Sequence, residues 1–152
     1  MDTLYNWILF GHIIGAATWF GGHLLLEGMG ATAKRSGDPA IYTRHIVTAS
    51  KTTERLMPVA AIMTLGFGIW LVIEGTWEFS DVFVSIGLLV AILGFVIGFA
   101  FLTPKGKQLA GLVDEDGVDS KDAFELARKL SMGDHAMTGI LLVAMVAMIF
   151  KF

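Results

Sequence analysis

The sequence predicts an all-α integral membrane protein built as an antiparallel bundle of four transmembrane helices. Of its 152 residues, 55% are hydrophobic and only 16% are charged, a balance too apolar for an ordinary soluble domain. The apolar residues fall into four runs, 5–26, 56–73, 82–102 and 133–150. Each run approaches the roughly 20 residues that a helix needs to cross the hydrocarbon core. The sequence outside these four runs leaves no room for another folded unit, so residues 1–152 are expected to form one domain.

The positive charges predict how the helices are oriented. Ten of the eleven Lys and Arg residues lie in the connections 27–55 and 103–132, and the remaining one is Lys151. Positive charges concentrate on the cytoplasmic side of membrane proteins, so both connections are expected in the cytoplasm and both termini outside. The sequence therefore predicts a multi-pass protein of a bacterial-type inner (cytoplasmic) membrane.

Local signals predict where the first two helices end and begin. The glycines within residues 27–30 are expected to end the first helix, because glycine disfavours helix interiors. Asp38 is a predicted N-cap and Pro39 fits the first helical position. The second helix is therefore expected to begin well before the membrane.

The last two helices have similar signals. The third span is expected to end at residues 103–104, with residues 105–112 at the membrane interface. Ser120 is a predicted cap for the last helix, and Gly133 is expected to interrupt that helix before its apolar run.

Histidines inside the first apolar run are the strongest functional signal. Ionisable residues within a membrane are rare and mark functional sites by default. At about 100° per residue, His12, Ala16, Trp19 and His23 share one stripe, and the two histidines lie roughly 16 Å apart along the axis. The stripe therefore predicts an outer site at His12 and an inner site at His23. The structural alternative is that another helix satisfies His12 through a backbone carbonyl or a Thr side chain.

The donor types indicate haem or copper. Imidazole suits haem iron and copper, and thioether suits haem or Cu(I). The chain has no cysteine, which excludes thiolate ligands and iron–sulfur clusters. The candidate metal ligands are His12, Met145 and Met148 in an outer tier, and His23 and His135 in an inner tier toward the cytoplasm. Two tiers of donors fit one or two haem b groups, or a copper path of His and Met, whereas packing is the alternative for each methionine.

Three other residues are candidates for holding a cofactor, each with a structural alternative. Trp19 shares the histidine stripe, where it either stacks on a cofactor or packs in the core. Arg55 either pairs with haem propionates or contacts lipid headgroups. Lys151 either binds a cofactor or extends to the outer headgroups.

Several short motifs resemble a known group of proteins. The first helix motif, Gly11-His12-Ile13-Ile14-Gly15-Ala16-Ala17-Thr18-Trp19-Phe20-Gly21-Gly22, is similar to that of a bacterial four-helix membrane group. This group includes the copper-resistance D domain, HemJ-type protoporphyrinogen oxidases and uncharacterised small membrane proteins, which the chain resembles most. Further similarities are 54–58, 66–71, 103–104 and 148–151.

The resemblance implies roles for two residues. In HemJ-type proteins the first-helix histidine binds haem b, and a lysine near the end of the last helix is needed for activity; His12 and Lys151 match these positions. The chain lacks the polar residues that HemJ-type proteins carry in the third helix, and Phe152 follows Lys151 without the usual proline. The resemblance therefore implies haem binding more directly than protoporphyrinogen oxidation, and whether the chain is a membrane oxidoreductase stays open.

The sequence as a whole predicts a haem b protein of the cytochrome b type that transfers electrons within the membrane. A quinone or a redox partner subunit would exchange electrons with it, and the chain itself could form a homo-oligomer. A copper-binding or copper-transport protein and a cofactor-free structural subunit are the alternatives. Nucleic acid is not expected as a partner, since no basic patch with interleaved aromatic residues is present.

Overall fold

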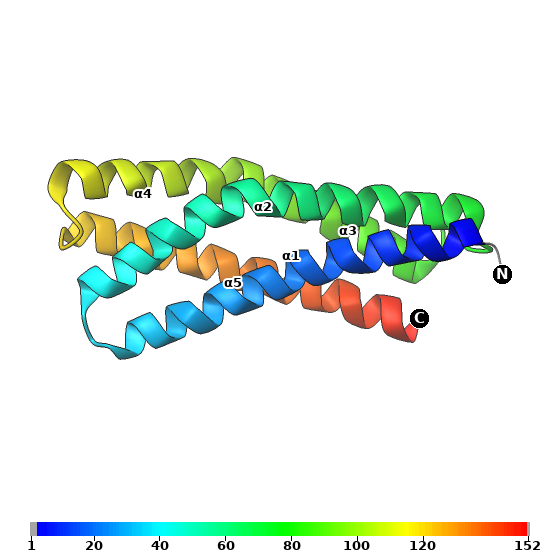
Figure 1. The fold of residues 1–152 in the computed structure, drawn as a ribbon, viewed down its shortest axis with the longest axis horizontal. Helices are drawn as coiled ribbons and strands as arrows, with labels where there is room; N and C mark the ends of the chain where they lie inside the picture. Colours follow the sequence, from blue (N-terminus) through cyan, green and yellow to red (C-terminus); the bar gives the residue numbers. More distant parts are fainter. Residues whose placement is uncertain (1–2, 152) are drawn as a thin grey trace.

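Four long helices run side by side and antiparallel in the computed structural model, which describes residues 3–151 (Figure 1). The elements are α1 (Thr3–Arg35), α2 (Pro39–Glu74), α3 (Val82–Ile97), the π-helical segment η1 (Gly98–Leu102), α4 (Thr103–Asp116) and α5 (Lys121–Phe150). Because α3, η1 and α4 follow one another directly, they form the third long helix. The predicted all-α four-helix bundle is confirmed.

The long helices have the length and composition of membrane spans. They contain 33, 36, 35 and 30 residues, and all four are apolar enough to cross a membrane. At 1.5 Å per residue they measure about 45–54 Å, more than the hydrocarbon core of about 30 Å. The protein is therefore a multi-pass membrane protein whose helices continue beyond the apolar layer.

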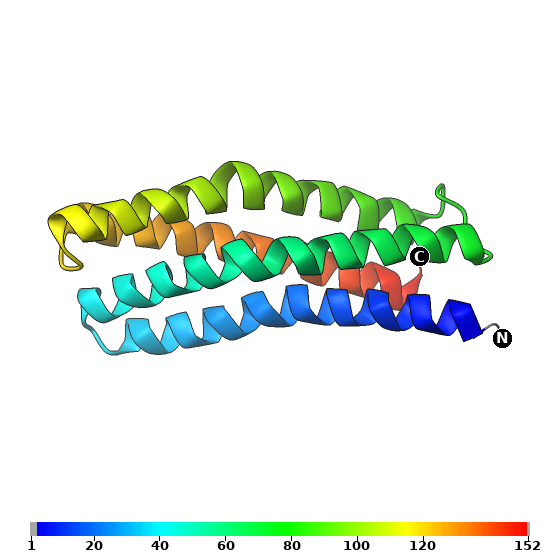
Figure 2. The ribbon, with the colours of Figure 1, turned by 45° about the horizontal axis from the view of Figure 1, so that its top comes forward.

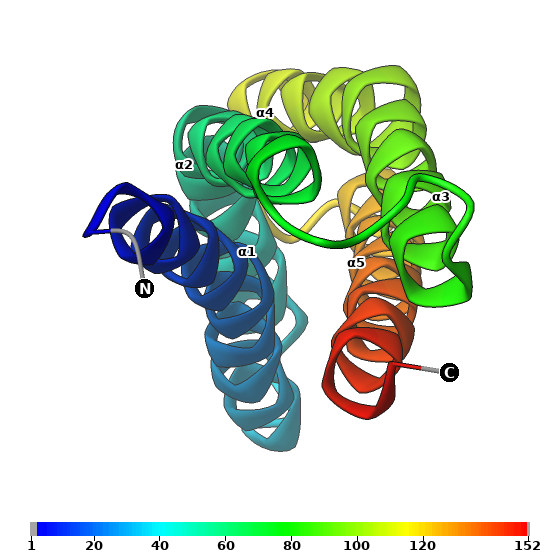
Figure 3. The same ribbon diagram turned by 90° about the vertical axis from the view of Figure 1, so that its right-hand side faces the viewer.

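The two ends of the bundle differ, which positions the cavities described below. Both termini and the 75–81 connection lie at one end, here named the terminal end (Figure 1). The turns at 36–38 and 117–120 lie at the other, the loop end. Figure 2 shows α1 beside α2 along the bundle, and the end-on view of Figure 3 places this pair opposite α3 and α5. Between the pairs lies a buried cluster that includes Trp19, Met57 and Met137.

The expected end of the first helix at residues 27–30 is wrong, because α1 continues to Arg35. Gly30 is buried, and a Cβ added there would lie 3.3 Å from Nε2 of His45 on α2. This glycine allows α1 and α2 to approach and does not end the helix. The prediction for α2 is confirmed, because the Asp38 side chain accepts a hydrogen bond from the backbone N–H of Ala40 at 2.8 Å.

The third long helix continues past residues 103–104, where the third apolar span is expected to end. Pro104 has no N–H, and its ring would clash with the carbonyl four residues earlier in a regular helix. The chain widens to the π-helical segment η1, in which the N–H of Thr103 bonds to the carbonyl of Gly98. A π turn keeps the backbone hydrogen-bonded where an open break inside lipid would be costly, so the helix passes Pro104 without ending.

Gly133 does not interrupt the last helix, since α5 runs without a break from Lys121 to Phe150. A Cβ at this position would lie 2.8 Å from the ring of Phe101. The glycine therefore provides room for an aromatic side chain of η1. The predicted cap is confirmed, because the Ser120 hydroxyl accepts a hydrogen bond from the N–H of Ala123 at 3.3 Å.

Gly15 is the position where an added methyl group is expected to destabilise the fold most clearly. A Cβ there would lie 2.8 Å from the backbone nitrogen of Thr64, and backbone cannot rotate aside. Gly15→Ala should therefore lower the free energy of unfolding by about 1–3 kcal/mol. Gly21→Ala is the control, because its Cβ would meet nothing within 4 Å. Thermal unfolding in mild detergent measures both, and equal melting temperatures would contradict this account of α1–α2 packing.

Candidate functional site

A large cavity lies at the terminal end between the α1–α2 pair and the α3–α5 pair. Its volume is about 530 Å³, within the range of ligand-binding pockets. We name it the apolar cavity, because most of its wall is aliphatic or aromatic. Residues that line it include Leu9, His12, Ala16, Trp19, Thr64, Gly68, Val72, Trp77, Phe83, Gly87, Leu141, Met145, Met148 and Lys151.

His12 is the imidazole in the wall of the apolar cavity. Its Nδ1–H donates a hydrogen bond of 2.8 Å to the backbone carbonyl of Thr64 on α2. That carbonyl fixes the tautomer and leaves Nε2 with its lone pair for a ligand, the arrangement in which histidine usually binds a metal. Gly68 provides the room, because a Cβ there would lie 3.1 Å from the His12 ring. The structural alternative expected from the sequence was that a backbone carbonyl of another helix satisfies His12. The Thr64 carbonyl does so for Nδ1 alone.

Lys151 and two methionines line the same cavity from α5 and its C-terminal end. Nζ of Lys151 lies 4.3 Å from the ring centroid of Trp77, which in turn packs edge-on against Phe83. This contact holds the lysine near the terminal end of the cavity. Met145 and Met148 also line the cavity that His12 lines. The three donors predicted for the outer tier therefore lie in the wall of one cavity.

His23 lies at a second, smaller cavity of about 60 Å³, the His23 pocket, which Trp19, Ser50, Thr53, Glu54, Met57 and Met137 also line. The side chain is buried, with 1% of its surface exposed. Its Nδ1–H donates a 2.6 Å hydrogen bond to Oδ1 of Asp134. Its Nε2 is buried without a hydrogen-bond partner among the described residues. One ring nitrogen is therefore firmly oriented and the other is free.

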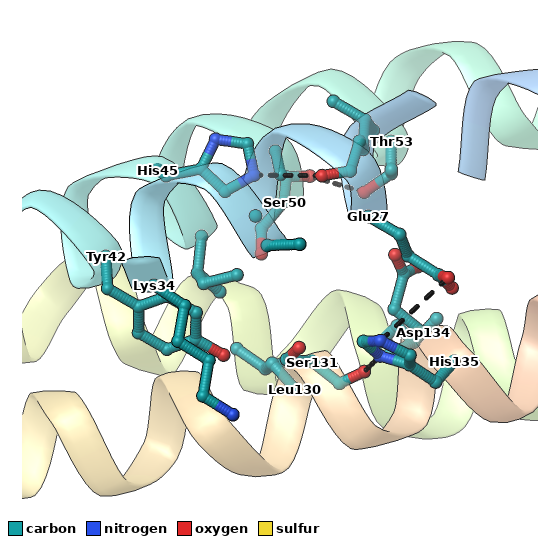
Figure 4. A pocket seen from close by; sticks show the side chains of 16 residues that line it. Glu27, Lys34, Tyr42, His45, Ser50, Thr53, Leu130, Ser131, Asp134 and His135 are labelled. Carbon is teal, nitrogen blue, oxygen red and sulfur yellow. Dashed lines mark hydrogen bonds and ion pairs between the residues drawn. The ribbon is translucent and has the colours of Figure 1, made fainter. Parts of the chain in front are cut away.

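A third cavity of about 220 Å³ lies toward the loop end, and we name it the polar groove (Figure 4). Its lining includes Glu27, Lys34, His45, Ser50, Thr53, Ser131, Asp134 and His135. His45 donates from Nε2 to the carbonyl of Leu26 at 3.0 Å, and His135 donates from Nδ1 to the carbonyl of Ser131. Glu27 accepts a hydrogen bond from the Thr138 hydroxyl.

The structure separates the two histidines expected at the inner tier. His135 has 62% of its side chain exposed and lines the polar groove, with Nε2 3.9 Å from a Glu27 oxygen. His23 instead lines the His23 pocket. The two imidazoles do not face one shared cavity, and we assign no metal to either of them.

Of the other predicted residues, Trp19 is 4% exposed and lines both the apolar cavity and the His23 pocket. Arg55 is exposed on α2 and lines none of the three cavities. The sequence did not point to Asp134, although its place beside His135 at the start of the last apolar run was a signal. No sequence pattern pointed to Thr64, because it contacts His12 through its backbone carbonyl, a group that every residue has.

Donor geometry limits how a metal would be held. Within residues 3–151, no three side chains of His, Asp or Glu are arranged to hold a metal ion. An iron already held by a porphyrin needs only one or two ligands from the protein. Comparison with protein-family models, curated proteins and solved structures finds no significant match.

Proposed function

We propose that this chain is a membrane haem b protein that binds one haem in the apolar cavity and transfers electrons within the bilayer. The observation that carries the proposal is the His12 geometry: Nδ1–H is fixed on the Thr64 carbonyl, which leaves Nε2 for the haem iron. The cavity's volume of about 530 Å³ and its mostly apolar wall suit a flat hydrophobic macrocycle. Bound haem would supply one-electron redox chemistry.

The chain's own residues would set the properties of that site. His12 would bind the haem, the Thr64 carbonyl would orient the imidazole, and the apolar wall would exclude water. Met145 and Met148 are thioether side chains of α5 that line the cavity, and either would offer a second protein ligand. Lys151 is the cation at the terminal end of the cavity, suited to a propionate carboxylate.

The proposed orientation follows the charges of the chain. With both basic connections in the cytoplasm, the apolar cavity lies nearer the outer face of a bacterial-type inner membrane. A membrane-dissolved quinone or a redox partner subunit would reach it from the lipid. Ile13 and Ile149 line the cavity and are themselves well exposed, which supports access from the side.

Haem titration of the purified apoprotein tests the stoichiometry. Haem b added in mild detergent should give a Soret band that grows linearly and reaches its end point at one haem per chain. The reason is that the apolar cavity is large enough for haem and is lined by an imidazole whose Nε2 is not used by the Thr64 carbonyl. An end point at two haems per chain would contradict the single site and reinstate an inner haem. The absence of a defined end point would contradict specific haem binding.

A further inference from the structure

A hydrogen bond between His23 and Asp134 connects two cavities of different character. Asp134 lines the polar groove, whereas His23 lines the His23 pocket, and the 2.6 Å bond joins them. The carboxylate is 22% exposed and the imidazole side chain 2%. A carboxylate in contact with water in the groove therefore orients a base in the interior, at a depth where ionisable groups are rare.

Nε2 of His23 is the unexplained atom. It is buried and unpaired among the described residues, and a buried polar atom without a partner is destabilising. The His23 pocket, at about 60 Å³, has space for water, and Ser50 and Thr53 line both this pocket and the polar groove. A path for a proton from the groove to Nε2 would run through water and these hydroxyl groups.

Carboxylates of three helices are the charged groups near His23. On α5 Asp134 is in contact, and on α1 Glu27 lies one turn away and faces His135 at 3.9 Å. Glu54 of α2 lines the His23 pocket and is already paired with Lys107 of α4 at 2.9 Å. The facing helix α3 has no charged residue. Asp134 is the carboxylate in contact with the imidazole and is the counter-ion that a protonated ring would have.

We propose that His23 is a proton-loading site for the redox group of the apolar cavity. When a one-electron reductant adds an electron there, one proton from water in the polar groove forms an N–H bond at Nε2, and Asp134 remains an ionised counter-ion. Oxidation releases the proton by the same path. This inference rests on the proposed haem at His12.

Electrostatics links the two sites. Trp19 lines both cavities and lies one helical turn from His23. His12 and His23 are roughly 16 Å apart along α1. A unit charge at that distance and an effective dielectric constant of about 20 changes the proton affinity of His23 about fivefold. An added electron strengthens proton binding, so reduction and proton uptake reinforce each other.

The test is the midpoint potential of the haem-loaded protein from pH 5 to 9, set with dithionite and mediator dyes and followed at the haem α band. For one electron, a tenfold change in proton affinity corresponds to 59 mV, so a fivefold change corresponds to about 40 mV. The midpoint potential should therefore fall by about 40 mV as the pH rises through the range in which His23 loses its proton. His23→Gln should remove this component. Asp134→Asn should also alter this component, because the counter-ion of His23 is lost. His45→Gln, a histidine bonded to a backbone carbonyl, should leave it unchanged.

The outcomes separate the two proposals. A haem-loaded protein whose pH dependence is identical in the wild type, His23→Gln and Asp134→Asn contradicts the proton-loading site alone. If His23→Gln does not fold, the shift in Asp134→Asn decides the question. A protein that binds no haem contradicts the proposed function, and this inference fails with it.

Discussion

His12→Ala is expected to lower the haem content of the purified protein more than tenfold. The imidazole of His12 is the proposed haem ligand on α1, and alanine has no donor atom to replace it in the wall of the apolar cavity. The fold should persist, because His12 is only half-buried and its hydrogen bond is to a carbonyl on the regular helix α2. Haem per chain is measured by pyridine haemochrome absorbance, with helix content followed by circular dichroism.

Two matched variants make the result specific. His45→Ala removes another histidine that is bonded to a backbone carbonyl and should keep full haem content, because His45 lines the polar groove. His12→Gly leaves a gap that free imidazole can occupy, so imidazole should restore the Soret band. Wild-type haem content in a folded His12→Ala protein would refute the assignment of His12.

Gly68→Val is expected to lower haem affinity about tenfold or more while His12 stays in place. A Cβ at Gly68 would lie 3.1 Å from Nδ1 and Cε1 of the imidazole, and the branched valine side chain extends further. The ring must then leave the Thr64 carbonyl, which lies one turn earlier on α2, and Nε2 loses its orientation. The Kd from haem titration is the measurement.

Gly66→Val is the matched control for this prediction. It lies two residues away on the same helix, and a Cβ there would meet nothing within 4 Å. Both variants carry the same cost of a β-branched residue in a helix, so their difference reports contact with His12. Equal haem affinity in the two valine variants would show that the position of the His12 ring does not control binding.

Sequence patterns were sufficient for the parts of this protein that depend on hydropathy and helix periodicity. Four apolar runs predicted the bundle, and the stripe through His12, Trp19 and His23 predicted side chains that line cavities at two depths. That α1 continues past residues 27–30 and that the third long helix continues past residues 103–104 could not be predicted. There, tertiary contact at Gly30 and the π turn before Pro104 outweigh the local preference of glycine and proline.

Partners in space were the other limit of the sequence. The carbonyl that orients His12 belongs to a threonine whose side chain is not involved, so no residue pattern identifies it. His135 was expected beside His23 because both lie at similar depth, but its neighbour Asp134 makes the contact. Adjacent residues on a helix point about 100° apart, and depth alone does not say which of them faces the core.

The most direct test of the proposed function is an oxidised and dithionite-reduced absorption spectrum of the protein purified in mild detergent, with iron and copper quantified on the same sample. The account predicts a Soret band that sharpens on reduction, distinct α and β bands, and about one iron per chain. A featureless spectrum with bound copper would contradict it and favour copper binding by His12, Met145 and Met148. The third possible result is a spectrum without haem from a sample without bound metal. As a control for haem loss, a known cytochrome extracted in the same way with added haem must retain its haem. With that control, the result would contradict both haem binding and copper binding and favour a structural subunit.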